Sequence, residues 1–301
     1  MRIWVTGAGG FVGTRLVARL SAAGHEVHAS DRELDVADAA RVARGLARAR
    51  PQAIVHLAAL SSVSETAADP WAALRVNYFG ARSVLAGAVR EVPHARVLLV
   101  GSAQVYGSAA PGSPAFDERA PLRPASAYAW TKASADLLGA VHARRGLDVV
   151  RVRPFNHTGP GRPDRFVEAS FARQIAEIEA GLRPPRIEVG NLDAVRDFLH
   201  VDDVIDAYVR LLDRSAPPGV YNVASGAGLA VGAILAALLA LSPLGARVEV
   251  RMDRARWRPT ETSVGRADRL AEKTGWAPRV PTSALWSELL DDWRRRVATQ
   301  G

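Results

Sequence analysis

The sequence predicts an α/β fold in which a doubly wound parallel sheet is followed by a smaller C-terminal α/β lobe. Three observations lead to this prediction. Apolar runs of strand length alternate with amphipathic stretches of helical length, a glycine-rich turn follows the first strand, and proline and glycine become frequent after Pro154. Such alternation is typical of βαβ units, which place helices on both faces of a parallel sheet. With 301 residues, 48% of them hydrophobic, the chain can bury a large core.

Five short apolar runs in the first half of the chain are the expected strands. Helical patterns separate them, each long enough to cross back over a sheet. The runs are residues 3–6, 27–30, 54–57, 97–100 and 149–153. We therefore expect residues 1–155 to form one domain with parallel strands.

The character of the chain changes after Pro154. Proline and glycine cluster at residues 159–161, 184–185 and 217–219, between shorter elements, which favours a second lobe. A helix over residues 198–213 and a strand over 220–224 look regular enough to return to the main sheet. We therefore assign residues 198–225 to the first domain, and residues 156–197 and 226–301 to the lobe.

Composition and charge exclude several classes of protein. The chain has no cysteine, which excludes disulfides and thiolate metal sites and is consistent with a reducing cytoplasm. We expect a cytoplasmic protein with no membrane span, because the first residues enter a strand pattern at once and no apolar run approaches ~20 residues. The net charge of +8 comes from dispersed arginines without interleaved aromatics, so we expect no nucleic-acid partner. His157 and His200 have no partner at ligand spacing, so we expect no metal.

A glycine pattern stands between the first expected strand and the first helix. The first glycine permits a tight turn, the second lets backbone N–H groups approach a pyrophosphate, and the third lets helix and strand pack closely. The pattern predicts a Rossmann-type dinucleotide site. Its residues are Gly7, Gly10, Phe11, Val12 and Gly13.

An acidic residue, Asp31, ends the second expected strand about 20 residues further on, where a ribose contact is needed. Its carboxylate would accept a hydrogen bond from a 2′-hydroxyl and repel a 2′-phosphate. Arg32 beside it could instead pair with that phosphate. The choice between NAD and NADP therefore stays open.

Two further segments are placed to line the dinucleotide. Asp35 and Val36 would flank the adenine, and Leu57, Ala58 and Ala59, at the end of a later strand, would line the ribose. The alternative for both segments is an ordinary strand end.

Tyr128 and Lys132 are four residues apart at the start of an expected helix, so both side chains share one helical face. A neighbouring ammonium and a positively charged nicotinamide would lower the pKa of a tyrosine from its ordinary value near ~10. Such a tyrosine can exchange a proton with a carbinol while a hydride moves. Ser102 follows the strand at 97–100, and its hydroxyl could orient the substrate oxygen. The order of these residues is the one that a single hydride-transfer site needs.

With these residues in place, the sequence resembles the extended short-chain dehydrogenase/reductase superfamily, the NAD-dependent epimerase/dehydratase family, over nearly its whole length. Ser102, Tyr128 and Lys132 match the family's catalytic triad, and Asn77 with Gly80 matches a helix contact near its active site. The resemblance implies a nicotinamide cofactor, NAD(P)H. Four later stretches resemble the GDP-mannose-modifying branch: residues 153–161, 166–176, 189–198 and 258–261.

That branch contains 4,6-dehydratases and 4-keto reductases. The dehydratases carry an acidic residue two positions after the triad Ser or Thr, whereas this chain has Gln104, which cannot transfer a proton. The resemblance therefore implies NAD(P)H-dependent reduction of the 4-keto group of a GDP-4-keto-6-deoxyhexose, as in GDP-rhamnose-type synthesis.

The resemblance also implies contacts with a GDP-linked sugar. Arginine suits a diphosphate because its fork donates two parallel hydrogen bonds. An ion pair with Asp197 is the alternative for Arg196, and a solvated loop charge is the alternative for Arg258. The implied contacts are Gln104, Asn156 on the sugar or diphosphate, Phe166 and Val167 beside the base, Arg196 and Arg258 on the diphosphate, and Glu261 on the ribose.

Two other functions stay open. A C4 epimerase would use the same triad twice and keep NAD bound, and a dinucleotide-sensing protein would keep the fold without the chemistry, although such proteins usually lose the Tyr or the Lys. Family members commonly pair through the helix that carries Tyr128 and the one before it. The resemblance therefore implies a homodimer.

Overall fold

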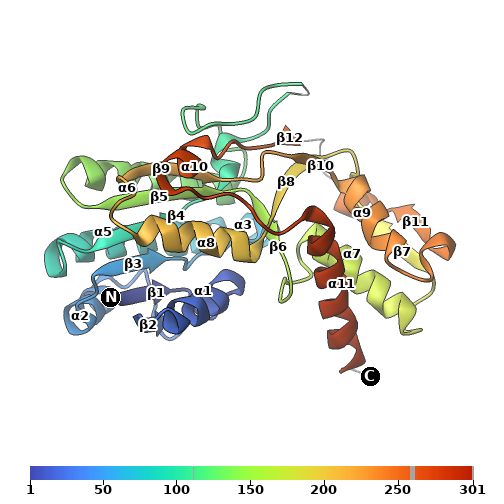
Figure 1. Ribbon diagram of the computed structural model, residues 1–301, viewed down its shortest axis with the longest axis horizontal. Helices are drawn as coiled ribbons and strands as arrows, with labels where there is room; N and C mark the ends of the chain where they lie inside the picture. Colours follow the sequence, from blue (N-terminus) through green and yellow to red (C-terminus); the bar gives the residue numbers. More distant parts are fainter. Residues whose placement is uncertain (111, 258–261, 300–301) are drawn as a thin grey trace.

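Six parallel strands form the sheet of the larger domain in the computed structural model, which describes residues 1–110, 112–257 and 262–299 (Figure 1). The second strand lies at one edge of the sheet, and the chain then crosses to the opposite side of the first strand, where the later strands follow. The strand order therefore reverses next to β1. In such sheets, ligands bind outside the carboxyl ends of the strands at this reversal. The strands, in spatial order, are β2 (Glu26–Ser30), β1 (Arg2–Thr6), β3 (Ala53–His56), β4 (Arg96–Val100), β5 (Val149–Pro154) and β9 (Gly219–Val223).

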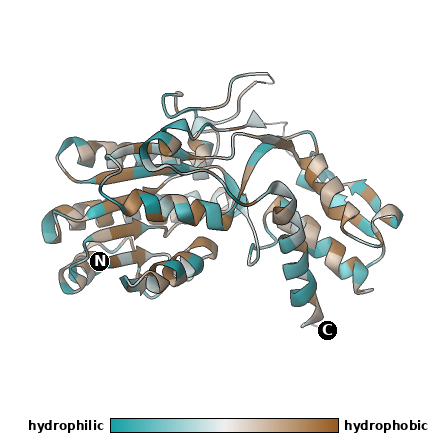
Figure 2. Ribbon diagram, in the orientation of Figure 1, coloured by the Kyte–Doolittle hydropathy of each residue, from teal (hydrophilic) through white to brown (hydrophobic). Residues whose placement is uncertain are grey.

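Helices cover both faces of this sheet, because successive strand residues point to opposite sides. Ile3 and Val5 enter the core under α1 (Phe11–Ala22), α8 (Val201–Leu212) and α10 (Asp268–Thr274). Trp4 enters the core on the other face. That face is covered by α2 (Ala39–Ala49), α5 (Gly80–Glu91) and α6 (Ala127–Arg144). The apolar strands thus lie between two layers of helices, along which hydrophobic and hydrophilic residues alternate (Figure 2). The expected doubly wound α/β fold is confirmed.

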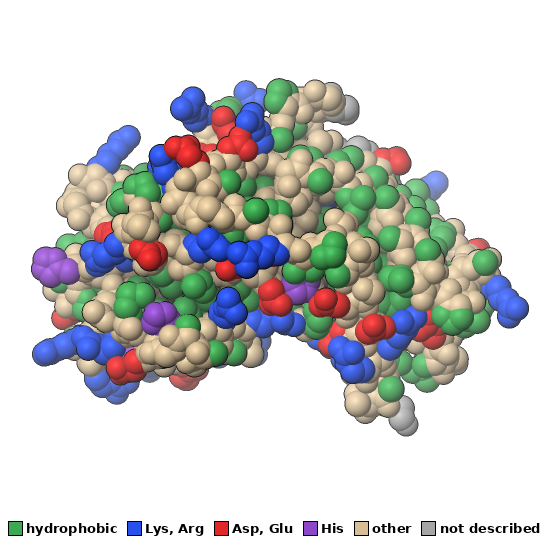
Figure 3. Space-filling view, in the orientation of Figure 1, with side chains coloured by type: hydrophobic (Ala, Val, Ile, Leu, Met, Phe, Trp, Pro, Cys, Tyr) green, Lys and Arg blue, Asp and Glu red, His purple; other side chains and the backbone are tan. Residues whose placement is uncertain are grey.

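A second lobe lies beyond the carboxyl ends of the strands (Figure 1). Its helices are α7 (Val167–Glu179), α9 (Val231–Ala240) and α11 (Thr282–Ala298), which share one apolar core. Its strands are β6 (Asn156–Thr158), β7 (Arg186–Val189), β8 (Val195–His200), β10 (Gly228–Ala230), β11 (Glu249–Met252) and β12 (Thr262–Ser263). The surface is hollowed between this lobe and the larger domain (Figure 3).

Two segments of the later chain pack with the larger domain. Strand β9 pairs with β5, and Leu270 and Trp276 belong to the core beneath α8. Residues around α10 therefore pack with the larger domain, although the sequence grouped all of 226–301 with the lobe. The division into domains otherwise stays a prediction.

One expected helix begins later than the sequence suggested. Residues 198–200 belong to strand β8, where Phe198 pairs with Asn156 of β6, and the helix starts at Val201. The strand ends where it does because His200 caps α8, its Nδ1 accepting a hydrogen bond from the N–H of Asp202 at 3.2 Å.

Short helices complete the chain. They are α3 (Val63–Ala68), α4 (Pro70–Ala73), the π-helical turn η1 (Leu74–Phe79), and the 3₁₀ turns η2 (Ala103–Tyr106), η3 (Gly245–Arg247) and η4 (Arg254–Arg256). In the described ranges, no helix is long and apolar enough to cross a membrane.

Candidate active site

The glycine loop between β1 and α1 is shaped by close backbone contacts. A Cβ on Gly7, where φ is +72°, would lie 2.7 Å from the backbone nitrogen of Ala58, and a Cβ on Gly13 would lie 2.2 Å from the carbonyl oxygen of Gly7. Gly10 is the N-cap residue of α1, and no side chain caps this helix. The first N–H groups of α1 therefore lack side-chain partners at the helix end that favours an anion.

The carboxylate of Asp31 lies against this loop, since a Cβ on Gly9 would be 2.5 Å from its Oδ2. The N–H of Asp31 donates to Oε1 of Glu33 at 2.8 Å, which lowers the pKa of Glu33. Two carboxylates thus flank the exposed Arg32. Arg32 is therefore the one positive charge within this tripeptide.

Asp35 and Val36 make contacts within the protein. Oδ2 of Asp35 accepts a hydrogen bond from Arg75 at 2.6 Å. Val36 is buried and packs against Gly80, whose Cβ, if present, would lie 2.7 Å from a methyl carbon of Val36. These residues hold the loop after β2 against η1 and α5.

Asn77 lies on the π-helical turn η1, a feature that is frequent at functional sites. Its Oδ1 accepts from the N–H of Leu60 at 2.8 Å, and its Nδ2 donates to the carbonyl oxygen of Leu60 and to Oγ1 of Thr131. Asn77 therefore ties the loop after β3, which carries Leu57, Ala58 and Ala59, to helix α6.

The three residues of the expected triad meet near the carboxyl end of β4. Ser102 follows this strand, and Tyr128 stands in the first turn of α6, where the side chain of Ser126 caps the helix by accepting from Ala129 at 3.1 Å. Tyr128 and Lys132 are 8% and 6% exposed. The side chain of Ser102 is close enough to Tyr128 to act on its pKa, and Lys132 Nζ donates to the carbonyl oxygen of Val100 at 2.8 Å.

Burial dominates the electrostatics of the triad. It raises the pKa of Tyr128, against the opposing effects of the Ser102 hydrogen bond and of the positive charge of Arg162. It lowers the pKa of Lys132 to about 8. The sequence predicted that Lys132 would lower the pKa of Tyr128, but the charge that does so in this structure is Arg162.

A buried polar network fixes α6 on the sheet. Arg153 donates to both carboxylate oxygens of Asp136, at 2.7 and 3.1 Å, and to the hydroxyl of Tyr106 at 2.9 Å. The hydroxyl of Tyr106 donates in turn to Asn222 at 2.7 Å. Sequence reasoning missed this network, although Asp136 stands one turn after Lys132, and a carboxylate on the buried face of a helix signals a buried partner.

The expected sugar-nucleotide contacts are spread over the junction of the two lobes. Gln104 is exposed next to Ser102, and Val167 is 40% exposed at the start of α7. Asn156 donates to the carbonyl oxygen of Asp197 at 3.1 Å. Arg196 precedes Asp197 on β8. Arg258 and Glu261 lie outside the described residues.

Asp197, beside Arg196, is buried and pins two turns. Its carboxylate accepts from the N–H and the hydroxyl of Ser225 and from the N–H groups of Gly226 and Gly265. This carboxylate therefore shapes the sheet of the second lobe.

Sequence reasoning also missed Arg162 and Glu168. Arg162 is 8% exposed, its Nε donates to Oε1 of Glu168 at 3.1 Å, and its guanidinium carbon lies 3.5 Å from the ring centre of Phe166. The available signal was an arginine directly after the turn at 159–161, four residues before an aromatic side chain.

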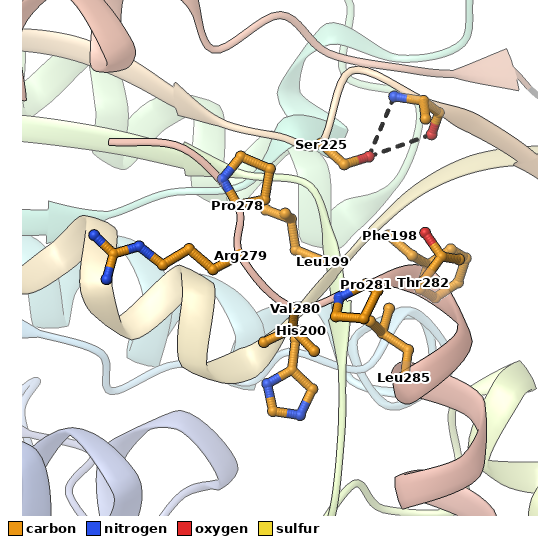
Figure 4. Close-up of a pocket in the computed structure, with 11 residues that line it drawn as sticks. Phe198, Leu199, His200, Ser225, Pro278, Arg279, Val280, Pro281, Thr282 and Leu285 are labelled. Carbon is orange, nitrogen blue, oxygen red and sulfur yellow. Dashed lines mark hydrogen bonds between the residues drawn. The ribbon is translucent and has the colours of Figure 1, made fainter. Parts of the chain in front are cut away.

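A pocket away from the triad lies between β8, the turn at Ser225 and the segment 278–285 (Figure 4). The hydroxyl of Ser225 is engaged with Ala227, and the guanidinium of Arg279 points away from the other lining residues. Across the described part of the chain, no cluster of three or more His, Asp or Glu could hold a metal ion.

Comparison with known proteins agrees with this geometry. A family model described as the NAD dependent epimerase/dehydratase family matches residues 3–224. This chain belongs to that family. GDP-6-deoxy-D-mannose reductase of Pseudomonas aeruginosa is 35% identical over 98% of both chains. UDP-glucose 4-epimerase of Mycolicibacterium smegmatis is 31% identical over 98% of this chain and 99% of the relative.

Among solved structures, RMD from Pseudomonas aeruginosa complexed with NADPH superposes with a TM-score of 0.88 at 34% identity, covering 98% of this chain and 99% of that one. The resemblance seen in the sequence is therefore confirmed, and the protein is an oxidoreductase of the NAD(P)-dependent epimerase/dehydratase family. Its glycine loop fits the family's dinucleotide, because the loop leaves no room for a Cβ at Gly7 or Gly13 and α1 begins without a side-chain cap.

Proposed function

We propose that this protein reduces the 4-keto group of a GDP-4-keto-6-deoxyhexose with NAD(P)H. One observation carries the proposal: Ser102, Tyr128 and Lys132 lie together at the carboxyl end of β4, with a glutamine at position 104 where a dehydratase needs an acid. The similarity to GDP-6-deoxy-D-mannose reductase over nearly the full length of both chains supports the choice of substrate.

The buried triad suits a reduction. A bound nicotinamide supplies the hydride to the carbonyl carbon. Because burial raises the pKa of Tyr128, the phenol holds its proton at neutral pH and can donate it to the carbonyl oxygen. Ser102 orients that oxygen, and Lys132, one turn along α6, keeps a positive charge near the reacting groups at pH values below about 8.

The remaining predicted contacts form part of the same proposal. Asp31, with Asp35, Val36 and the segment 57–59, would hold the adenosine half of the dinucleotide. Asn156, Phe166, Val167, Arg196, Arg258 and Glu261 would hold the GDP-sugar, and Gln104 would contact the sugar. A cytoplasmic location belongs to the proposal and is supported by the absence of cysteine.

Cofactor preference follows from the surroundings of the ribose. If Arg32 reads a 2′-phosphate, Arg32→Ala should weaken NADPH binding far more than NADH binding, as measured by fluorescence titration of each. Equal effects on the two would contradict that role and leave Asp31 to select NADH.

A C4 epimerase is the second candidate, favoured by the 31% identity to UDP-glucose 4-epimerase. It would use the triad once in each direction and would consume no cofactor. Tightly bound dinucleotide that copurifies with the protein, together with an isomerised sugar nucleotide, would favour it.

The deciding assay follows oxidation of NADH and of NADPH with GDP-4-keto-6-deoxymannose, which a separate dehydratase generates from GDP-mannose. We expect stoichiometric loss of the reduced nicotinamide and formation of a GDP-6-deoxyhexose. Tyr128→Phe should abolish turnover and leave cofactor affinity nearly unchanged, because only the proton donor is lost. Undiminished turnover by that variant would refute the mechanism.

We also propose that the protein is a homodimer. Exposed apolar side chains gather on α4, η1 and α6, three helices that contact one another. These side chains are Trp71, Phe79, Trp130, Leu137 and Val141. Leu137→Glu should give a monomer by light scattering after size exclusion, whereas Leu182→Glu, a control at an equally exposed leucine in the second lobe, should not. A wild-type monomer would refute the proposal.

A further inference from the structure

Arg162 carries a positive charge at the junction of the two lobes. The chain makes a tight turn before it, with Gly159 at φ +146° and Gly161 at φ +90°. Both lobes hold this turn: Arg15 of α1 donates to the carbonyl oxygen of Pro160 at 3.0 Å, and Asp292 of α11 accepts from the N–H of Gly161 at 2.8 Å. The position of Arg162 is therefore fixed by both lobes.

The guanidinium is anchored at one nitrogen alone. Its Nε donates to Glu168, which is 2% exposed, whereas its two terminal nitrogens make no hydrogen bond with any residue that the structure describes. Neither terminal nitrogen is among the buried atoms without a partner, so both reach accessible space. Glu168 thus aligns the fork and leaves four N–H donors available.

The surroundings of the fork point to its ligand. The guanidinium carbon lies 5.1 Å from the ring centre of Phe11, the residue that opens α1 directly after the glycine loop. The charge of Arg162 is also felt by Tyr128. The free donors therefore lie close to Phe11 at the uncapped N-terminus of α1, and near enough to Tyr128 for their charge to act on it, so a nucleotide that reaches both would bring its phosphates to them.

We propose that Arg162, aligned by Glu168 and packed between Phe11 and Phe166, binds a diphosphate oxygen of a nucleotide bound at the active site. A planar fork with free parallel donors matches phosphate geometry, and a nearly buried cation gains most from such a partner. The diphosphate belongs either to the dinucleotide or to the sugar nucleotide. If the diphosphate belongs to the sugar nucleotide, this inference rests on the proposed function; if it belongs to the dinucleotide, it does not.

The test removes the charge of Arg162 together with that of Glu168, so that neither side chain is left as an unpaired buried charge. The double variant Arg162→Gln/Glu168→Gln replaces the ion pair by two neutral amides. The matched control is Arg183→Gln/Glu177→Gln, which neutralises another Arg–Glu pair of the same lobe, whose charged atoms lie 3.2 Å apart. Dissociation constants for NADPH and for GDP are measured separately on the full-length protein, and urea midpoints check that each variant folds.

We expect the double variant to weaken binding of one of the two probes by about tenfold to a hundredfold, the range for a charge-assisted hydrogen bond. Loss confined to NADPH assigns the dinucleotide, and loss confined to GDP assigns the sugar nucleotide. Arg162→Lys should recover only part of the affinity, because an ammonium lacks the fork. Unchanged constants for both probes in a folded double variant would overturn the proposal. Because these measurements need no turnover, a protein that binds NADPH but has no reductase activity still shows whether Arg162 binds the diphosphate of the dinucleotide.

Discussion

Arg153 and Arg162 are both buried and both pair with a buried carboxylate, but they complete their hydrogen bonds differently. Each nitrogen of the Arg153 guanidinium donates within the protein, to Asp136, to Tyr106 or to the carbonyl oxygen of Glu118. Within the described ranges, Arg162 donates through Nε alone, to Glu168. A fully paired buried cation holds structure together, whereas a partly paired one that reaches accessible space is prepared for a ligand.

The neighbours of the two pairs support this distinction. The first joins β5 to α6, the helix that carries Tyr128 and Lys132, and so holds that helix on the sheet. The second stands on the turn that both lobes hold and packs on Phe11 and Phe166. The variants below separate a structural pair from a binding pair.

The largest expected effect is on stability. Asp136→Asn leaves Arg153 buried without its carboxylate and should cost about 3–5 kcal/mol, whereas Glu168→Gln should cost about 1–3 kcal/mol, because water can reach the terminal nitrogens of Arg162. Urea unfolding at pH 7 measures both. Equal losses would mean that Arg162 is as enclosed as Arg153, and the distinction between the two pairs would fail.

Lys132 is another buried cation, and it pairs with no carboxylate among the residues that the structure describes. Burial lowers its pKa to about 8, below the value of ~10.4 in an unfolded chain, so the native state binds this proton less well. The penalty is fully present below about pH 8 and disappears as the pH rises through the unfolded value.

We therefore expect Lys132→Met to be inactive yet more stable than wild type at pH 7, by roughly 1–3 kcal/mol, with the difference shrinking toward pH 10. Denaturant melts of both proteins across this range provide the measurement. Lys273→Met, at an exposed lysine of α10, is the control and should show no such trend. A Lys132→Met protein that is less stable at pH 7 would show that the hydrogen bond to Val100 outweighs the burial of the charge.

The sequence predicted well where a local pattern determines the chemistry. Gly7 and Gly13 could be assigned because the close backbone approach demands glycine, and Tyr128 with Lys132 because four residues make one helical turn. The helix expected at 198–213 starts later, since a short apolar run fits a strand as well as a helix and only pairing with β6 decides.

Pairing across the fold could not be predicted in this way. Arg153 meets Asp136, and Arg162 comes to influence Tyr128, only after strands and lobes have assembled. A sequence with many arginines does not reveal which ones will be buried. The sequence therefore singled out Ser102, Tyr128 and Lys132, whose role stays a prediction, but it assigned the electrostatic support of Tyr128 to Lys132 and overlooked Arg162.

The smallest expected effect is on the pKa of Tyr128, and it tests directly whether the charge of Arg162 lowers that pKa. Because the charge of Arg162 lowers the pKa of Tyr128, the double variant Arg162→Gln/Glu168→Gln should raise it. Reduction needs the protonated phenol, so the loss of rate that follows the titration of Tyr128, at higher pH than the loss that follows Lys132 near pH 8, should move upward by at most about one pH unit. The pH profile of kcat, measured at saturating NADPH and keto sugar, separates this from weaker binding. A profile that stays in place while the affinity for a nucleotide falls would leave Arg162 as a phosphate-binding residue alone. A shift without any loss of affinity would make it a positioning residue for Tyr128, acting through charge and not through contact with a ligand.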